Sequence, residues 1–255
     1  MIYNTPIIHS FGEVRFQVKS LLIVIILLIA SVSVFGTDFE TLHEEFVQIR
    51  SMQDSQKMSE FILKMEKENL KEIEKLTLLA DAHREYANWI DDKKVREAHY
   101  KTSRELAERA IDMNSKYGMA YYVKGASIGQ LAQMAGILQS MFLITDFDKS
   151  IDKAMELMPD SPFPFVAKGM RDRDTPWPYR DYNKSEKRFL KAIENDPAYI
   201  NSYYELALLY EVWKKKDLAA TYYKKVIELD LQPDFLVQGQ ESKEKAAKWL
   251  KDNGY

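Results

Sequence analysis

The feature that most constrains this chain is the recurrence of compact side chains at matched places in successive segments of helical periodicity. Ala110, Ala154, Ala192 and Val226 hold corresponding positions and lie 44, 38 and 34 residues apart. Such spacing is expected when a two-helix unit repeats, because compact residues let the paired helices approach closely. Few glycines or prolines interrupt the chain, nine and eight in all, so the sequence predicts an all-α protein.

Apolar residues follow the helical period from residue 38 onward. We expect helices near 38–52, 55–69, 71–91, 93–115, 118–132, 146–158, 162–172, 183–195, 199–214, 216–229 and 240–252. The segment 133–145 is apolar and harder to assign. A short buried helix with its turn is our expectation there.

The most regular unit starts at residue 200 and matches the tetratricopeptide pattern at seven positions. These are Tyr203, Leu206, Ala207 and Tyr210 in its first helix and Ala219, Tyr223 and Val226 in its second. A second unit over 162–197 fits with Phe165 and Gly169, and the loop 173–179 absorbs four extra residues. The sequence therefore predicts a tetratricopeptide-like solenoid of helical hairpins, with roughly 10–11 helices and its best repeats at 162–197 and 200–233. A generic amphipathic helical bundle is the alternative.

The uncharged apolar run from Leu21 to Phe35 is preceded by Arg15 and Lys19 and followed by Gly36. This order is typical of a secretory signal peptide. The run has 15 residues, fewer than the roughly 20 that span a bilayer. We expect residues 1–36 to be a signal peptide and 37–255 to be one helical domain in the bacterial periplasm. The alternative is an inner-membrane anchor at 21–35 with the helical domain outside.

Charge and motif content argue against several functional classes. The 36 basic and 39 acidic residues leave no basic excess for nucleic acid. The absence of cysteine excludes thiol catalysis and zinc–thiolate sites. Glu40 and His43 have the spacing of a helical di-iron ligand pair, but the motif occurs once and that site needs it twice. The sequence predicts no enzyme activity, no cofactor and no metal.

Several short motifs resemble those of a known group of exported helical proteins. They are Leu78-Leu79-Ala80 with Tyr86, Arg109-Ala110, Tyr121-Tyr122 with Gly125 and Gly129, Ala154-Met155-Glu156-Leu157 with Pro159, Phe189-Leu190-Lys191-Ala192-Ile193 with Pro197-Ala198-Tyr199, and Ala247 with Trp249-Leu250. Over about 70–252 the chain resembles the periplasmic T-component (TatT-like) proteins of tripartite ATP-independent periplasmic (TRAP) transporters. This resemblance implies an accessory protein of solute uptake that binds a periplasmic solute-binding protein and offers a pocket for a small apolar ligand. The missing cysteine after the apolar run departs from lipid-anchored members.

The first helix of each pair is expected to line the concave face of such a solenoid, where partners bind. The inward positions, together with a loop tryptophan between two prolines, are Met119, Tyr122, Phe163, Val166, Met170, Arg173, Trp177, Tyr204, Leu208 and Glu211. Their apolar and aromatic character suits an apolar peptide, a partner helix or a lipophilic ligand. Two alternatives stay open: these residues are ordinary core, or the chain is a general cell-envelope scaffold without a ligand. Homo-oligomers also stay open.

Overall fold

The computed structural model describes residues 38–68 and 70–255, apart from the side chains of residues 137 and 138. The predicted signal peptide or anchor over 1–36 lies outside these residues. The chain divides into a unit that ends at Asp38 and a unit that spans Phe39–Tyr255, and only the second is treated below. Among the described residues, no helix has the length and apolar character needed to cross a bilayer.

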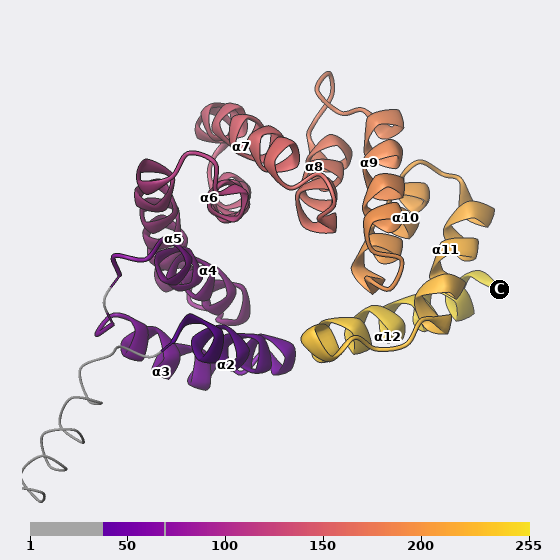
Figure 1. The fold of residues 1–255 in the computed structure, drawn as a ribbon. Coiled ribbons are helices and arrows are strands. Elements are labelled where there is room, and N and C mark those ends of the chain that lie inside the picture. The colour runs from indigo at the N-terminus through magenta and orange to yellow at the C-terminus, as the bar shows by residue number, and fades with distance from the viewer. Residues whose placement is uncertain (1–37, 69) are drawn as a thin grey trace, which may run out of the picture. The chain divides into compact units, whose positions relative to one another are not determined.

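The described residues form eleven α-helices and one short 3-10 helix, with no strand among them (Figure 1). The helices are α2 (Phe39–Met52), α3 (Ser55–Met65), α4 (Ile73–Trp89), α5 (Lys93–Met113), α6 (Gly118–Met134), α7 (Ile137–Leu157), α8 (Pro162–Asp174), α9 (Tyr182–Asn195), α10 (Ile200–Val212), α11 (Lys216–Glu228) and α12 (Leu236–Asn253), and the 3-10 helix η2 is Pro233–Phe235. The predicted all-α fold class is confirmed. Most helix bounds lie within a few residues of those expected from the sequence.

The expectation of a separate short helix over 133–145 is wrong. Helix α6 runs to Met134, and α7 starts at Ile137 and continues without a break to Leu157. After Gly136 no glycine or proline interrupts the helical hydrogen bonding, so the apolar stretch and the amphipathic one that follows form one helix. The stretch is also not fully buried, because Met141 and Phe142 are 49% and 79% exposed.

Consecutive helices pack as hairpins at the small residues that the sequence singled out. A Cβ added to Gly125 of α6 would lie 2.6 Å from Cδ1 of Ile151 in α7. A Cβ added to Gly169 of α8 would lie 2.6 Å from Cε1 of Phe189 in α9. Both distances are far below normal van der Waals contact, so only glycine permits these approaches. The matched positions Ala110, Ala154, Ala192 and Val226 are all fully buried.

Two large apolar cores fill the unit, one in each half. The first is built from α2 to α6 and includes Phe46, Phe61 and Leu79. The second is built from α8 to α12 and includes Phe189 and Tyr223. A smaller cluster of Ile128, Phe147 and Ile151 in α6 and α7 lies between them in the sequence. Each half therefore has its own apolar support.

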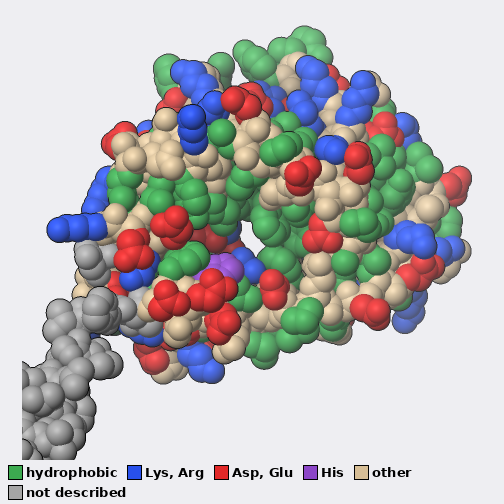
Figure 2. Space-filling view, in the orientation of Figure 1, with side chains coloured by type: hydrophobic (Ala, Val, Ile, Leu, Met, Phe, Trp, Pro, Cys, Tyr) green, Lys and Arg blue, Asp and Glu red, His purple; other side chains and the backbone are tan. Residues whose placement is uncertain are grey.

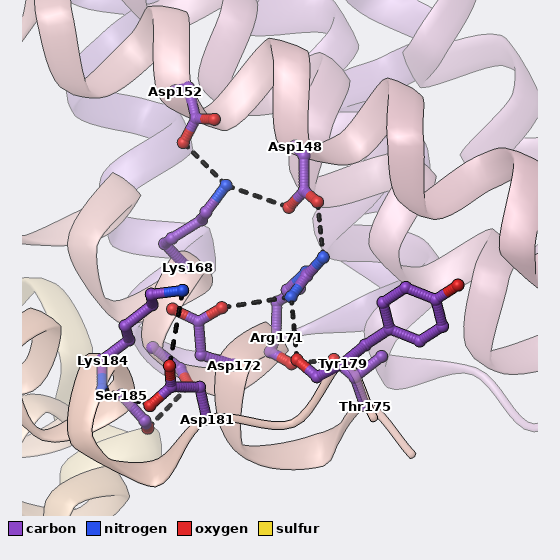
Figure 3. A network of polar contacts seen from close by, with 11 residues as sticks. Asp148, Asp152, Lys168, Arg171, Asp172, Thr175, Tyr179, Asp181, Lys184 and Ser185 are labelled. Carbon is purple, nitrogen blue, oxygen red and sulfur yellow. Dashed lines mark hydrogen bonds and ion pairs between the residues drawn. The ribbon is translucent and has the colours of Figure 1, made fainter. Parts of the chain in front are cut away.

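Polar contacts join α7 to α8, where the two halves meet (Figure 3). Lys168 Nζ lies 2.9 Å from Asp148 Oδ1 and 2.7 Å from Asp152 Oδ1, so one ammonium bridges two turns of α7. Arg171 Nη2 lies 2.6 Å from the other oxygen of Asp148. Ser185 of α9 donates to the carbonyl of Gly169 at 2.8 Å, which ties the next helix to the same place. These contacts fix the relative position of α7, α8 and α9.

The first and last helices of the unit also meet, so the solenoid closes on itself. The helices follow a curve in Figure 1 that brings α12 back to α2. Ser51 of α2 donates to the carbonyl of Pro233, and the backbone N–H of Leu236 donates to Ser51 Oγ at 3.4 Å. The guanidinium of Arg50 lies 4.5 Å from the centre of the Phe235 ring. A small polar and aromatic contact therefore joins the two ends.

Replacing Gly169 by alanine tests the close approach of α8 and α9. The added methyl group meets the fully buried ring of Phe189, and overpacking outweighs the higher helix propensity of alanine. We expect the free energy of unfolding to fall by about 1–2 kcal/mol in denaturant titrations. Gly136→Ala is the matched control, because a Cβ there meets nothing within 4 Å. Equal stability of both variants would contradict the packing described.

A buried histidine pair between α4 and α5 makes stability depend on pH. His83 Nδ1 lies 2.8 Å from His99 Nδ1, and burial, with a further contribution from His99, lowers the pKa of His83 to about 4. Between the ordinary pKa of 6.5 and about 4, the unfolded chain therefore binds more protons than the folded one. We expect the free energy of unfolding to fall by roughly 1–3 kcal/mol as the pH drops through this window.

His83→Gln should flatten this dependence, while the exposed His43→Gln should leave it unchanged. Denaturant titrations at several pH values measure both variants. An unchanged pH slope in His83→Gln would show that the histidine pair is not its cause.

Candidate functional site

The inner face of the closed solenoid surrounds an open cavity of about 650 Å³. Its walls come from α2, α4, α6, α8, α10 and α12, with a contribution from α7. Figure 2 shows that the unit is hollowed near its centre. The volume lies within the range of roughly 300–1,000 Å³ that is usual for small-molecule sites.

Six of the ten residues predicted for binding lie in this lining. They are Met119 and Tyr122 of α6, Phe163, Val166 and Met170 of α8, and Tyr204 of α10. All six come from first helices of hairpins, as the tetratricopeptide pattern expects. The structure therefore brings together, around one cavity, side chains that lie more than 80 residues apart in sequence.

The other four predicted residues lie elsewhere. Arg173 is buried and its Nη1 lies 2.6 Å from Oε2 of Glu205. Leu208 packs against the second apolar core. Glu211 accepts a hydrogen bond of 2.9 Å from the hydroxyl of Tyr223. Trp177, on the loop between α8 and α9, is 81% exposed. It does not line the cavity, and no neighbouring helix pair covers it.

Four aromatic rings form a connected group at one end of the cavity. The centre of the Phe163 ring lies 5.9 Å from that of Tyr122 and 5.3 Å from that of Tyr199. The rings of Tyr199 and Phe235 are 5.1 Å apart. Tyr199 and Phe235 were not predicted from the sequence, because neither holds an inward position of a first helix: Tyr199 precedes α10 and Phe235 ends η2.

A charged cluster lies beside these rings and was also missed. Arg84 Nη2 lies 2.7 Å from Asp81 Oδ1 and 2.6 Å from Glu85 Oε1. Burial raises the pKa of the Asp81 carboxyl, although the Arg84 guanidinium acts in the opposite direction. Arg84 also lies 5.8 Å from the centre of the Tyr122 ring. The sequence offered one signal, because Asp81 is the one charged residue in the stretch of α4 from Leu76 to Ala82.

Almost every other charged side chain of the lining is paired. The pairs are Arg171 with Asp148, Glu205 and Asp174 with Arg173, and Glu241 with Lys245. Arg50 differs, since it makes no ion pair with any residue that the structure describes. Its guanidinium lies instead over the rings of Phe235 and Phe46.

The arrangement has the properties of a binding site. The described residues contain no group of three or more histidine, cysteine, aspartate or glutamate side chains placed to hold a metal ion. The aromatic and methionine side chains offer apolar contact area, and the paired charges are held by their partners. Such a surface can enclose an apolar body and orient one polar end of it.

Comparison with solved structures shows the tetratricopeptide fold. A thermophilic tetratricopeptide protein of Thermus thermophilus, TTC0263, is similar with a TM-score of 0.64 and 15% identity, over 84% of this chain and 99% of that one. MamA of Desulfovibrio magneticus has a TM-score of 0.48 and 16% identity, over 76% of this chain and 97% of its own. At 15% identity the likeness to TTC0263 concerns the fold alone. The predicted tetratricopeptide-like solenoid is confirmed.

A search of curated proteins found no match to the sequence. The association with TRAP transporters that the motifs implied therefore stays a prediction. A family model does match, over residues 42–170, which include α3 to α7, nearly all of α2 and most of α8. That range carries Arg50, Asp81, Arg84 and Tyr122 of the cavity lining. Because the match covers half of the sequence, the chain belongs to the family described as regulator of microtubule dynamics protein 1-3.

Proposed function

We propose that this chain is a non-catalytic scaffold that binds a partner protein and holds a small apolar ligand in the cavity of its closed solenoid. The observation that carries the proposal is the cavity of about 650 Å³, whose mixed lining brings aromatic and methionine side chains together with paired charged ones. A tetratricopeptide fold supports protein–protein interaction in general. The family description names a regulator, which agrees with a scaffold more readily than with an enzyme.

The closure of the solenoid favours a small ligand over a long peptide inside it. In an open solenoid the concave face forms a groove along which an extended chain can lie. Here Ser51 of α2 contacts Pro233 and Leu236, so the groove is closed where its two ends meet. An apolar molecule that buries most of its surface suits such an enclosure.

The loop between α8 and α9 is our candidate for protein contact. Trp177 and Tyr179 are 81% and 57% exposed there, and large aromatic residues are frequent energetic centres of protein interfaces. Arg171 Nη1 donates to the carbonyl of Tyr179 at 3.4 Å, which holds the base of the loop. The loop therefore presents aromatic side chains on a fixed support.

The finer assignment is an accessory protein of a TRAP-type solute uptake system in the bacterial periplasm, with a solute-binding protein as partner. It is supported by the motif resemblance and by the apolar run from Leu21 to Phe35. The alternative is a general cell-envelope scaffold without a ligand. Neighbouring genes distinguish the two, because permease and solute-binding genes would favour uptake and envelope-assembly genes would favour the scaffold.

Filling the cavity tests the ligand site directly. Ala126 of α6 lines the cavity, so Ala126→Trp should occupy space that the ligand needs. We expect this variant to lose roughly tenfold or more of its affinity for N-phenyl-1-naphthylamine, an apolar dye whose fluorescence rises in apolar surroundings. Ala247→Trp on the exposed face of α12 is the matched control and should bind as the wild type does.

Circular dichroism must show equal helicity for both variants. Dye binding that is absent from the wild type, or equal in all three proteins, would remove the support for a ligand in the cavity. Loss of partner binding in Trp177→Ala, measured with a purified partner, would be a separate result on the loop.

A further inference from the structure

Arg50 is the one charged side chain of the cavity lining without an ion-pair partner among the described residues. Its guanidinium lies 4.5 Å from the centre of the Phe235 ring and 5.4 Å from that of Phe46. Its Nε is buried and has no hydrogen-bond acceptor in the described part of the chain. Aromatic rings contact a guanidinium through its faces and leave the N–H groups at its edge free to donate.

The neighbouring acids do not use these donors. Asp81 and Glu85 lie 2.7 and 2.6 Å from Arg84 Nη2, so Arg84 is their direct partner. The ionised carboxylates of Asp81 and Glu85 together carry one negative charge more than Arg84 neutralises. Arg50 acts on Asp81 at longer range. Burial raises the pKa of the Asp81 carboxyl, and the nearby Arg84 and Arg50 guanidinium groups act in the opposite direction.

Two tyrosines of the cavity lining belong to the same group of aromatic rings as Phe235. Tyr122 and Tyr199 both line the cavity, and neither hydroxyl has a hydrogen-bond partner among the residues that the structure describes. Burial raises the pKa of both phenols, so both remain protonated donors at neutral pH. The rings of both tyrosines contact the ring of Phe163. Arg50, Tyr122 and Tyr199 can therefore all donate hydrogen bonds to a ligand, and none of the three side chains carries a negative charge.

We propose that this end of the cavity binds the carboxylate of an apolar acid, with Arg50 as the charged partner and the hydroxyls of Tyr122 and Tyr199 as additional donors. A planar carboxylate accepts two parallel hydrogen bonds from a guanidinium, which gives both strength and orientation. Met119, Val166 and Met170 then contact the apolar body of the ligand. This inference rests on the proposed ligand site and adds the chemistry of the polar end.

Displacement of N-phenyl-1-naphthylamine by decanoate and by 1-decanol, which share an apolar chain, tests the proposal on the full folded unit. Decanoate should displace the dye from the wild type at a lower concentration than 1-decanol. Arg50→Gln should weaken decanoate by roughly tenfold or more and leave 1-decanol almost unchanged, since a hydrogen-bonded charge pair is lost only for the acid. Tyr199→Phe, which removes one hydroxyl, should weaken decanoate several-fold.

Two matched controls separate this effect from general loss of charge or hydroxyl. Arg109→Gln removes an exposed arginine of α5. Tyr121→Phe removes the hydroxyl of Tyr121, a neighbour of Tyr122 that does not line the cavity. Both should leave decanoate displacement as in the wild type. Tyr199→Phe keeps the ring that contacts Phe235. Its effect on decanoate displacement therefore measures the contribution of the hydroxyl, even if Arg50→Gln disturbs the junction of α2 and α12.

Several outcomes would overturn the proposal. Equal displacement by decanoate and 1-decanol would show that the carboxylate is not recognised, and equal weakening of both ligands by Arg50→Gln would show a structural role for Arg50. Tighter displacement by decyl phosphate, which has the same ten-carbon chain, than by decanoate would assign the end of the cavity to a phosphate. If the dye binds and neither ten-carbon ligand displaces it, this inference fails while the ligand site stands; if the dye does not bind, both fail.

Discussion

The structure depends on how closely the two helices of each hairpin approach one another. At Gly125 and Gly169 the partner side chains, Ile151 and Phe189, occupy the space that a Cβ would need. Close approach at such points sets how the two helices of a hairpin pack. A small rotation from each hairpin to the next, repeated along the chain, then produces the curvature. In this chain the curvature is large enough that α12 returns to α2.

That closure creates the features that distinguish the cavity from an ordinary concave face. It places Phe235, near the end of the chain, over Arg50, near the start of the described unit. It also places Tyr199 and Phe163 against the same ring. The Phe235 side chain therefore contacts three parts of the chain, and the Nε of Arg50 is buried without a hydrogen-bond acceptor among the described residues. The proposed binding chemistry depends on this closed geometry.

The sequence predicted the parts of this structure that depend on local periodicity. Compact residues at Ala110, Ala154 and Ala192 indicated the hairpins, and the position of Met119, Phe163 and Tyr204 within their helices indicated the inner face. The same rule placed Arg173 and Glu211 on that face. The structure pairs Arg173 with Glu205 and Glu211 with Tyr223, because polar side chains near a helix end can reach a neighbouring helix.

Features that depend on long-range contact were beyond the sequence. Nothing local distinguishes Arg50 from the many solvated basic residues, since its environment comes from Phe235, about 185 positions later. The exposure of Phe142 was missed for the same reason, because hydrophobicity alone does not show whether another element covers a residue. Local periodicity predicted the tetratricopeptide fold, which the likeness to TTC0263 confirms.

The closed solenoid is the central claim, and a distance between its two ends tests it most directly. The chain contains no cysteine, so Met52→Cys on α2 and Asp234→Cys on η2, both at exposed positions, can be spin-labelled without background. Double electron–electron resonance should give one short and narrow distance distribution. A broad distribution centred at long distances would show an open solenoid, and neither the cavity described above nor the contact of Arg50 with Phe235 would then exist.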